Sequence, residues 1–284
     1  MNPAMDTARP PGRVQWMLHA TLVALSLLTL FPLAIMVLLS LKDRAQIYGQ
    51  FWSLPNPIRW ENLADGVGLT LQYIWNSVVV SGGVVVLVVV CGALAAYAFV
   101  QLKYPGWRAI YTSIISLLMI PGILVLVPLY LTTRNLNLLN SYTGLILPQV
   151  AGFLPFAIFL FKTFFEQLPK DLFDSARIDG ASEWTVLASV VVPLSKPIVS
   201  TVVVLNLLSS WNNYVWPLVV VRDEALRTIP LGLVFLFTEL NLNNYPKPGL
   251  EMACYLVASL PMLIAFFFAM RTFMQGITSG ALKI

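Results

Sequence analysis

Histidine and cysteine are scarce in this sequence of 284 residues, which contains one histidine, His19, and two cysteines, Cys91 and Cys254. Both cysteines lie within apolar runs, where a thiol usually packs as a small hydrophobic group. Neither the cysteines nor the histidine has the neighbours that a metal site or a disulfide framework requires. We therefore expect no metal and no disulfide-stabilised fold, and a ligand or proton-relay role for His19 is disfavoured.

Sequence motifs of covalent and phosphoryl-transfer chemistry are also missing. No lysine follows a glycine, so the phosphate-binding loop G-x-x-x-x-G-K-[ST] is absent and the chain cannot itself be a P-loop ATPase. The serine-nucleophile pattern G-x-S-x-G and the zinc pattern H-E-x-x-H are absent as well. These absences predict a protein that is not an enzyme by itself, with no catalytic residues and no cofactor of its own.

Charged residues make up 11% of the chain, against roughly 25% in a soluble domain, whereas 58% of the residues are hydrophobic. A chain of this composition cannot bury its apolar surface within itself, so lipid must solvate its helices. The formal net charge of +4 comes from scattered basic residues and gives no electrostatic footprint for nucleic acid. An integral membrane protein is therefore predicted, with membrane lipid as a partner and no nucleic acid.

Six segments reach the length of about 20 mostly apolar residues that a helix needs to cross a bilayer: 16–40, 73–100, 110–131, 143–165, 194–220 and 250–273. The runs are too long and continuous for barrel strands, so the predicted fold class is all-α, a polytopic protein with six transmembrane helices. We expect residues 1–15 to form an N-terminal tail and residues 16–284 a single transmembrane domain. The first run follows Arg9 and Arg13 as in a signal peptide. It is about twice the usual length and lacks an A-x-A cleavage pattern, so we expect it to be retained.

The distribution of lysine and arginine predicts the orientation of the bundle. With the N-terminus inside, the inner side holds Arg9, Arg13, Lys103, Arg108, Lys162, Lys170, Arg177, Lys196, Arg271 and Lys283. The outer side then holds Lys42, Arg44, Arg59, Arg134, Arg222, Arg227 and Lys247. The larger inner set favours two cytoplasmic termini, by a small margin. The two longer outer loops, 41–72 and 221–249, either dock a partner outside the cell or cap the helices.

The predicted spans are nearly free of ionisable residues, which argues against an ion-coupled carrier, because such carriers need buried carboxylates or histidines. One span instead gathers neutral polar and aromatic side chains: Asn206, Ser209, Ser210, Trp211, Asn212, Asn213, Tyr214 and Trp216. Amides within hydrocarbon need hydrogen-bond partners or a wet cavity. Amides beside indole faces also suit an uncharged polyhydroxylated ligand. The cluster therefore either lines a solute path or joins helices by hydrogen bonds, and the sequence does not separate these alternatives.

One long polar passage, Gln167–Pro193, lies between the fourth and fifth predicted spans. Pro169 suits the first turn of a helix, and Asp171 suits its positive end. Gly180 is placed to end that helix in a left-handed cap, and Ser182 can cap a second helix. Acidic residues slightly outnumber basic ones here, unlike the basic face of a helix that lies on a membrane. A helix, a glycine turn and a second helix are therefore predicted to dock into a soluble partner.

The same passage resembles the EAA loop of binding-protein-dependent ABC importer permeases, whose pattern is E-A-A, three residues, G, nine residues and I-x-L-P. The positions of that pattern are held here by Asp174, Ser175, Ala176, Gly180, Val190, Val192 and Pro193. Four of them differ in residue type: Asp174 replaces Glu, Ser175 replaces Ala, Val190 replaces Ile and Val192 replaces Leu. Further landmarks resemble the carbohydrate-uptake branch of the family, in subunits similar to the maltose permease G subunit: Tyr73–Ser77, Trp211–Leu218, Arg227–Leu233 and Gly276–Lys283.

This resemblance implies the fold of a type I ABC importer permease, in which the EAA loop is a coupling helix seated in a cleft of the ATPase. It implies a second permease subunit, a cytoplasmic ATPase dimer that binds ATP and Mg, and an extracytoplasmic solute-binding protein, in a bacterial cytoplasmic membrane. The solute it implies is a sugar: a disaccharide, an oligosaccharide or a related polyol derivative. The expected coupling residues are Asp174, Ser175, Ala176, Asp179, Gly180, Ala181 and Pro193. The expected substrate path is Asn206, Ser209, Ser210, Trp211, Asn212, Asn213 and Trp216. An ion-coupled carrier without an ATPase and a membrane enzyme acting on lipid-linked sugars are the alternatives.

Overall fold

The computed structural model describes the backbone of residues 12–102, 104–242 and 247–281, and the side chains of residues 14–102, 104–239 and 247–268. Residues 1–11 of the expected tail and the side chains of the Gly276–Lys283 landmark lie outside this part. The chain divides into two compact units. Unit 1 comprises residues up to Leu69 together with Leu240–Val257, and unit 2 comprises Thr70–Glu239 and the residues from Ala258 onward.

Unit 1 contains α1 (Gly12–Ser40), α2 (Arg44–Gly49) and the first turns of α3 (Glu61–Tyr97) and α13 (Pro248–Ala281). Asp43 begins α2 as its N-cap, and the side chains of Asp43 and Gln46 each accept a hydrogen bond from the other's backbone N–H. This capping box satisfies N–H groups that the first turn of a helix leaves free. The start of α3 packs closely against α13, because a Cβ atom on Gly66 would lie 3.3 Å from the backbone of Ala253.

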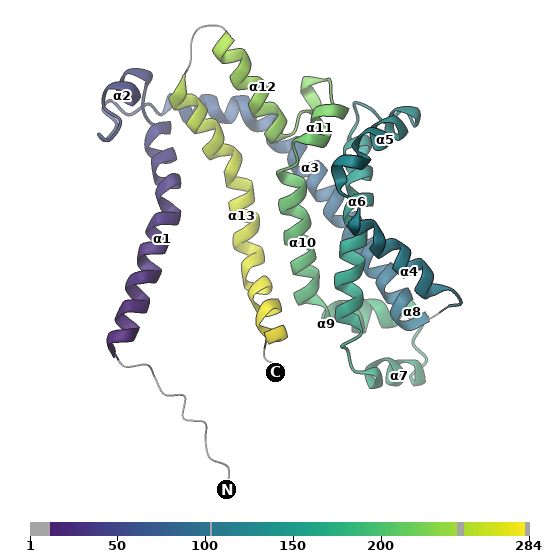
Figure 1. Ribbon diagram of the computed structural model, residues 1–284. Helices are drawn as coiled ribbons and strands as arrows, with labels where there is room; N and C mark the ends of the chain where they lie inside the picture. The colour runs from purple at the N-terminus through teal and green to yellow at the C-terminus, as the bar shows by residue number, and fades with distance from the viewer. Residues whose placement is uncertain (1–11, 103, 243–246, 282–284) are drawn as a thin grey trace. The chain divides into compact units, whose positions relative to one another are not determined.

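Unit 2 contains the remaining helices (Figure 1). They are the rest of α3, a π-helical segment at Ala98–Leu102, α4 (Trp107–Ser116), α5 (Gly122–Asn135), α6 (Tyr142–Phe165), α7 (Lys170–Ile178), α8 (Glu183–Val186), a second π-helical segment at Leu187–Val191, α9 (Val192–Leu194), α10 (Lys196–Trp211), α11 (Val215–Val220), α12 (Ile229–Leu242) up to Glu239, and the rest of α13. Short 3-10 turns lie at Leu117–Met119 and Glu224–Leu226. The predicted all-α class is confirmed, since no strand occurs among the described residues.

Four stretches of described helix are long and apolar enough to cross a membrane: Val14–Ser40, Glu61–Leu102, Tyr142–Phe165 and Pro248–Phe268. Two further pairs of helices meet the same criterion only when joined across a bend, which would bring the number to 6. One pair is Trp107–Met119 with Gly122–Asn135, bent by 107°, and the other is Glu183–Leu194 with Lys196–Trp211, bent by 78°.

The two predicted spans at 110–131 and 194–220 are therefore not single straight helices. The first breaks at Pro121, whose ring and missing N–H end the helix that precedes it. The second begins at the 78° bend between Leu194 and Lys196 and is interrupted again after Trp211, where Asn212 is the C-cap of α10 and α11 begins at Val215. Hydropathy measures the length of an apolar run and not its direction, so the sequence did not predict these turns.

The core of unit 2 forms where α3 and α10 pack on α6. Val84, Ala157, Phe161 and Val202 are completely buried there. A Cβ atom on Gly92 of α3 would lie 3.3 Å from both Ala157 and Phe161, so the glycine allows α3 and α6 to approach closely. This packing holds in place the lower ends of α3 and α6 in Figure 1, from which the polar loop at Gln167–Pro193 extends.

Candidate functional site

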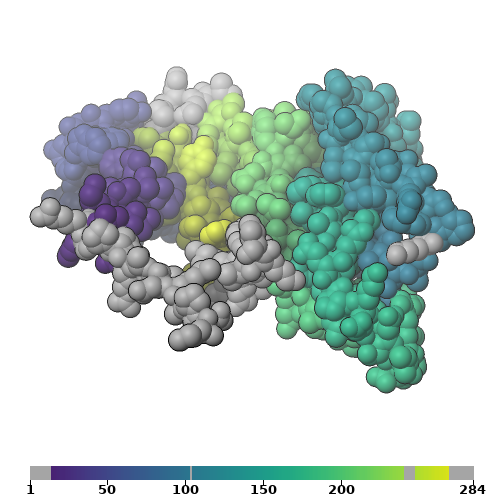
Figure 2. Space-filling model, turned by 60° about the horizontal axis from the view of Figure 1, so that its bottom comes forward, coloured from purple at the N-terminus to yellow at the C-terminus, as the bar shows by residue number. Residues whose placement is uncertain are grey.

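The polar loop folds as a helix, a glycine turn and a second helix, as predicted. α7 lies crosswise beneath α6 and α8 in Figure 1, and Figure 2 shows the teal-green surface that includes it standing out from unit 2. Gly180 has φ +79°, the left-handed conformation in which glycine carries no steric penalty. Its N–H donates to the Arg177 carbonyl, and the Ala181 N–H donates to the Ala176 carbonyl, both at 3.0 Å. These two bonds form a Schellman motif that satisfies the last carbonyls of α7.

The second helix of the loop begins at the predicted cap. The Ser182 hydroxyl accepts a hydrogen bond from the Thr185 backbone N–H at 3.2 Å and so satisfies one free donor of the first turn. The helix continues into the π-helical segment Leu187–Val191. π-helical turns occur frequently at functional sites, and this one lies between Ala181 and Pro193, two of the coupling residues expected from the resemblance.

The loop has one buried face and one exposed face. Phe173 of α7 is buried in the core of unit 2, as are Val186 and Val191 of the following helix. On the exposed face, Ile178 keeps 86% and Trp184 71% of its surface. Large apolar side chains that are held outward by a rigid, well-packed loop are typical of a protein–protein contact.

A polar network fixes the loop to the end of α3. Arg177 donates from Nε to Oε1 of Glu183 at 2.9 Å and from Nη2 to Oε1 of Gln101 at 3.1 Å. The Tyr97 hydroxyl donates to the other carboxylate oxygen of Glu183. The bond to Glu183, opposed by desolvation, raises the pKa of the Arg177 guanidinium above its ordinary value, so this side chain stays charged. Sequence reasoning missed Tyr97, near the end of the predicted span 73–100, and Gln101, the residue just after that span.

The expected coupling residues divide between the two faces. Asp174, Ser175 and Asp179 are exposed, whereas Ala176 and Ala181 pack against the core. Pro193 is exposed on α9, beyond the π-helical segment. Behind α7 lies a cavity of about 580 Å³, and its lining includes Trp107, Arg108, Lys170, Asp174 and Arg177. The structure thus brings residues 174–181 together in one compact turn, with Pro193 at its far end.

The predicted polar cluster in the fifth span does not converge on one surface. Asn206, Ser210, Trp211 and Trp216 are buried, Asn213 is half-buried, and Ser209 and Asn212 are exposed. Asn206 and Asn212 each donate to the carbonyl four residues earlier in α10, at 2.8 and 2.9 Å. The buried Ser210 hydroxyl finds no hydrogen-bond partner among the described residues. An unpaired hydroxyl of this kind costs free energy unless water or a ligand reaches it.

Two members of the cluster, Asn213 and Trp216, line a cavity of about 350 Å³ between α5, α6 and α11. The Asn213 amide donates to Oε1 of Gln149 at 3.1 Å, and the Trp216 indole N–H donates to the Gly144 carbonyl at 3.0 Å. Gln149 lines the same cavity, and sequence reasoning missed it. The sequence feature that could have indicated Gln149 is its single amide side chain beside Pro148 within an otherwise apolar span.

Two of the sequence landmarks meet in space although they lie about 150 residues apart. Asn76 is completely buried and donates to the carbonyls of Ala225 and Arg227, both at 2.8 Å. Its carbonyl oxygen accepts from the Tyr142 hydroxyl at 2.6 Å. A Cβ atom on Gly232 would lie 2.5 Å from the ring of Tyr73, so only glycine permits this approach. The Tyr73–Ser77 landmark therefore holds the Arg227–Leu233 landmark against α3.

No group of three or more histidine, cysteine, aspartate or glutamate side chains is placed to bind a metal ion in the described part of the chain. The arrangement contains an exposed apolar docking face, a polar network and a cavity with amide and indole groups. Such an arrangement suits binding and movement more than covalent chemistry.

Known relatives agree with this description. The chain is 33% identical over 265 residues to the arabinooligosaccharides transport system permease protein AraQ of Bacillus subtilis, covering 91% of this chain and 92% of the relative. It is 30% identical over 271 residues to the diacetylchitobiose uptake system permease protein NgcG of Streptomyces coelicolor, covering 93% and 88%. The crystal structure of a bacterial ABC transporter involved in the import of the acidic polysaccharide alginate contains a chain with the same fold, at a TM-score of 0.79, 23% identity and coverage of 93% and 98%.

Residues 88–279 match the model of a transport family described as the binding-protein-dependent transport system inner membrane component. The match includes the polar loop, the amide and indole cluster, and the Arg227–Leu233 landmark. This chain therefore belongs to the family of binding-protein-dependent transport system inner membrane components, the permease subunits of ABC importers.

Proposed function

We propose that this permease moves a sugar, namely a disaccharide, a short oligosaccharide or a related polyol derivative. We also propose that the loop Gln167–Pro193 receives the driving force from the ATPase. As a permease subunit of an ABC importer the chain is not an enzyme, and a separate ATPase subunit hydrolyses ATP. ATP and Mg are bound by that partner in the proposal. Membership of this family sets aside the ion-coupled carrier and the membrane enzyme that the sequence left as alternatives.

The observation that carries the coupling role is the two-faced loop. Its inner face is fixed in the core through Phe173, and its outer face presents Ile178 and Trp184 to solvent. The Schellman motif at Gly180 and the network around Arg177 hold that outer face in one shape. A rigid knob transmits a displacement because packed interiors do not deform continuously. A partner that grips Ile178 would therefore move the end of α3 together with α7.

The family implies three partners: a second permease subunit, an ATPase, and a solute-binding protein. In our proposal the ATPase is a dimer that seats α7 in a cleft, with Asp174, Ser175, Asp179 and Gly180 at the contact. Ala176 and Ala181 shape the loop from behind, and Pro193 lies at its far end. The solute-binding protein approaches the opposite side of the membrane and delivers the sugar.

Membrane orientation follows from these roles. The chain is a multi-pass protein of the cytoplasmic membrane. We infer that both termini are cytoplasmic, because this places Gln167–Pro193 on the side of the ATP supply and agrees with the larger inner set of lysine and arginine residues. We also propose that residues 16–284 form one transmembrane domain behind a short tail at 1–15.

The sugar class is supported by the chemistry of the polar cluster and by the named relatives. AraQ belongs to a transport system for arabinooligosaccharides, and NgcG to one for diacetylchitobiose. Neutral amides at Gln149 and Asn213 donate and accept hydrogen bonds, as sugar hydroxyls require, and the indole of Trp216 offers a flat face to ring C–H groups. We therefore propose the cavity between α5, α6 and α11 as part of the path, together with Asn206, Ser209, Ser210, Trp211 and Asn212.

The proposal is tested with the Ile178→Asp variant in the complete transporter, reconstituted in proteoliposomes with its solute-binding protein. Ile178 is 86% exposed, so the substitution should not disturb folding. We expect the Ile178→Asp permease to lose both the capture of the ATPase subunits and ATP-driven sugar uptake. The Ile178→Val control should retain both. Full capture and uptake by Ile178→Asp would contradict the docking role, and ATP-driven uptake of a solute other than a sugar would contradict the substrate class.

A further inference from the structure

A lysine is completely buried directly after α1. The ammonium of Lys42 donates to the carbonyl oxygens of Gln50 and Phe51 at 2.8 and 2.7 Å and lies 3.4 Å from the Ser53 hydroxyl. All three partners are neutral oxygens. Lysine is almost never fully buried without a carboxylate, so the burial of Lys42 needs an explanation. All three of its partners lie in the segment Asp43–Leu54, which we call the anchor loop.

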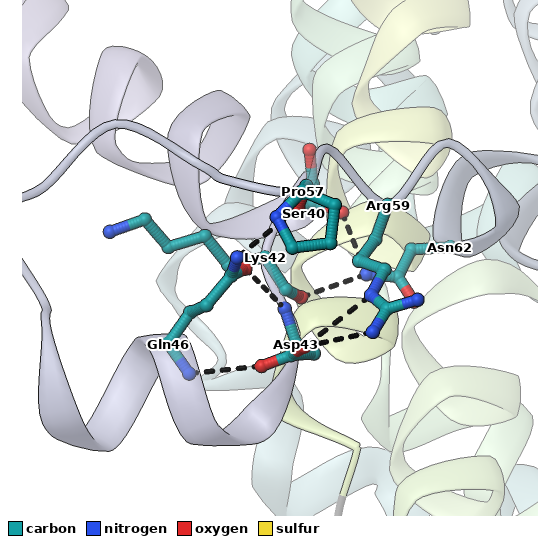
Figure 3. Close-up of polar contacts among 7 residues, drawn as sticks. All are labelled: Ser40, Lys42, Asp43, Gln46, Pro57, Arg59 and Asn62. Atoms are coloured by element: carbon teal, nitrogen blue, oxygen red, sulfur yellow. Dashed lines mark hydrogen bonds and ion pairs between the residues drawn. The ribbon is translucent and has the colours of Figure 1, made fainter.

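The base of the anchor loop is rigid. Figure 3 shows Asp43 at the centre of a polar cluster that joins both ends of the loop. Its carboxylate accepts from the Gln46 backbone N–H at 2.9 Å and from the Arg59 guanidinium at 3.1 Å. The Asn62 amide donates to the carbonyls of Ser40 and Lys42 at 3.0 and 2.9 Å. The polar groups therefore lie at the base, and the tip carries the apolar side chains.

The tip presents large apolar side chains outward. Trp52 keeps 75% of its surface exposed, Tyr48 71% and Leu54 79%. Trp52 packs edge-on against Phe51, with ring centroids 4.9 Å apart. A patch of this kind is covered either by lipid or by a protein that approaches from outside the cell.

The direction of the tip distinguishes these two occupants. Trp52 lies beside Phe31 of α1, with ring centroids 6.5 Å apart. Phe31 precedes the end of α1 at Ser40 by nine positions, or about 13 Å at a rise of about 1.5 Å per residue. The tip thus turns back along the side of α1 instead of extending beyond its end.

The length of α1 allows the depth of Phe31 in the bilayer to be calculated. Its 29 residues span roughly 44 Å, compared with about 30 Å of hydrocarbon. If the excess is shared equally, about 7 Å of helix projects on each side, and Phe31 then lies about 6 Å inside the hydrocarbon boundary. The ring of Trp52, with its centroid 6.5 Å from that of Phe31, then lies at or below the headgroup level at which tryptophan is enriched in membrane proteins.

We propose that the anchor loop inserts its tip into the leaflet at the C-terminal end of α1, with phospholipid as its occupant. Lys42 then has a clear role: it satisfies the Phe51 carbonyl, which lipid deprives of water, and ties it to the Gln50 carbonyl, which also accepts from the Ser53 hydroxyl and N–H. Arg44 is exposed on the same loop, 5.9 Å from the Tyr48 ring centroid, where its guanidinium can reach lipid phosphates. In the orientation proposed above, this leaflet is the outer one.

The test measures depth in the reconstituted transporter, in vesicles of phosphatidylethanolamine and phosphatidylglycerol. Cys91 and Cys254 are replaced by alanine, and a nitrobenzoxadiazole label is attached through Trp52→Cys or, as the matched control, Glu61→Cys. Glu61 is an exposed residue at the start of α3. We expect acyl-chain nitroxides to quench the label at 52 and aqueous iodide to quench it several-fold less than at 61.

Equal iodide quenching at the two positions would overturn the proposal, as would a label at 52 that only the solute-binding protein shields. The Lys42→Met variant provides a second test, because losing the donor to the Phe51 carbonyl and the link to the Gln50 carbonyl should make position 52 accessible to iodide. Unchanged quenching in that variant would overturn the role given to Lys42. The experiment measures the depth of the label and not transport. The proposed insertion can therefore be contradicted while the proposed function still holds.

Discussion

The Tyr97 hydroxyl donates a hydrogen bond to the carboxylate of Glu183 across 86 positions of sequence. Tyr97 is the last residue of α3, and the π-helical segment Ala98–Leu102 follows it directly. Glu183 opens α8 and also binds Arg177 of α7. A single carboxylate therefore joins α3, α7 and α8. We infer that a displacement of α7 reaches α3 through this carboxylate.

The Tyr97→Phe variant should weaken this link while keeping the buried ring. Loss of one hydrogen bond costs about 1 kcal/mol, so we expect a slightly lower Tm of the assembled transporter and more ATP hydrolysed per sugar imported. In a Glu183→Ala background the same change should have no further effect, because the acceptor is already gone. Tyr111→Phe is the control, since Tyr111 contacts Phe99 through its ring. Additive effects of the two substitutions would show that Tyr97 and Glu183 act separately.

Gly180 is a second position at which a substitution should impair coupling without preventing folding. A Cβ atom there would meet nothing within 4 Å, so a substitution is disfavoured only by the left-handed backbone at φ +79°. That conformation costs roughly 1–2 kcal/mol for most residues, and asparagine tolerates it best. We expect Gly180→Val to remain in the membrane with loss of ATPase stimulation by the solute-binding protein, and Gly180→Asn to keep most of the stimulation.

The measurement is ATPase activity of the purified complex with and without the solute-binding protein. Equal stimulation in Gly180→Val and the unmodified protein would mean that the turn geometry does not matter for coupling. If Gly180→Val and Gly180→Asn lost stimulation equally, the cause would be a side chain at the contact and not the backbone.

The sugar path is tested at Asn213, which lines the cavity and bonds to Gln149. Removing one neutral hydrogen-bonding group costs about 0.5–1.5 kcal/mol, which corresponds to a ~2- to 10-fold change. We expect Asn213→Ala to lower the rate of sugar uptake by this factor with normal assembly of the ATPase subunits. Asn135→Ala, at an exposed asparagine that ends α5, is the matched control. Unchanged uptake in Asn213→Ala would assign this part of the cluster to helix packing.

Local features of the fold could be predicted from the sequence because their causes lie within a few residues. The cap at Gly180, the cap at Ser182 and the helix at 143–165, observed at Tyr142–Phe165, follow from residue type and periodicity. The break at Pro121 could be expected as a kink, but not as a bend of 107°. The angle depends on how α4 and α5 pack against other helices, and no local pattern contains that information.

Contacts between distant segments could not be predicted in this way. Lys42 was interpreted only as a charge in an outer loop, yet it is completely buried. Gln149 appeared as one amide in an apolar run, and Tyr97 as an ordinary aromatic residue in a span. The roles of Gln149 and Tyr97 depend on partners tens of residues away, as in the bond between Gln149 and Asn213. The partners of Lys42 lie 8 to 11 residues ahead, in a loop whose path no local pattern predicts.

Asn76 shows what such a distant contact contributes to stability. Its amide donates to the carbonyls of Ala225 and Arg227 before α12, and its oxygen accepts from Tyr142 and from the Gln72 amide. The Asn76→Ala variant removes the partner of the Arg227 carbonyl and of the Tyr142 hydroxyl, at a cost on the order of 1–3 kcal/mol, while the Gln72 amide still donates to the Ala225 carbonyl. We expect a clear fall in the Tm of the purified complex and a loop before α12 that proteases cut more readily. Gln72→Ala, which removes one donor at the edge of the same network, should lower the Tm by less. If both variants lowered the Tm equally, the central position of Asn76 would be refuted, because the number of lost partners would not determine the effect.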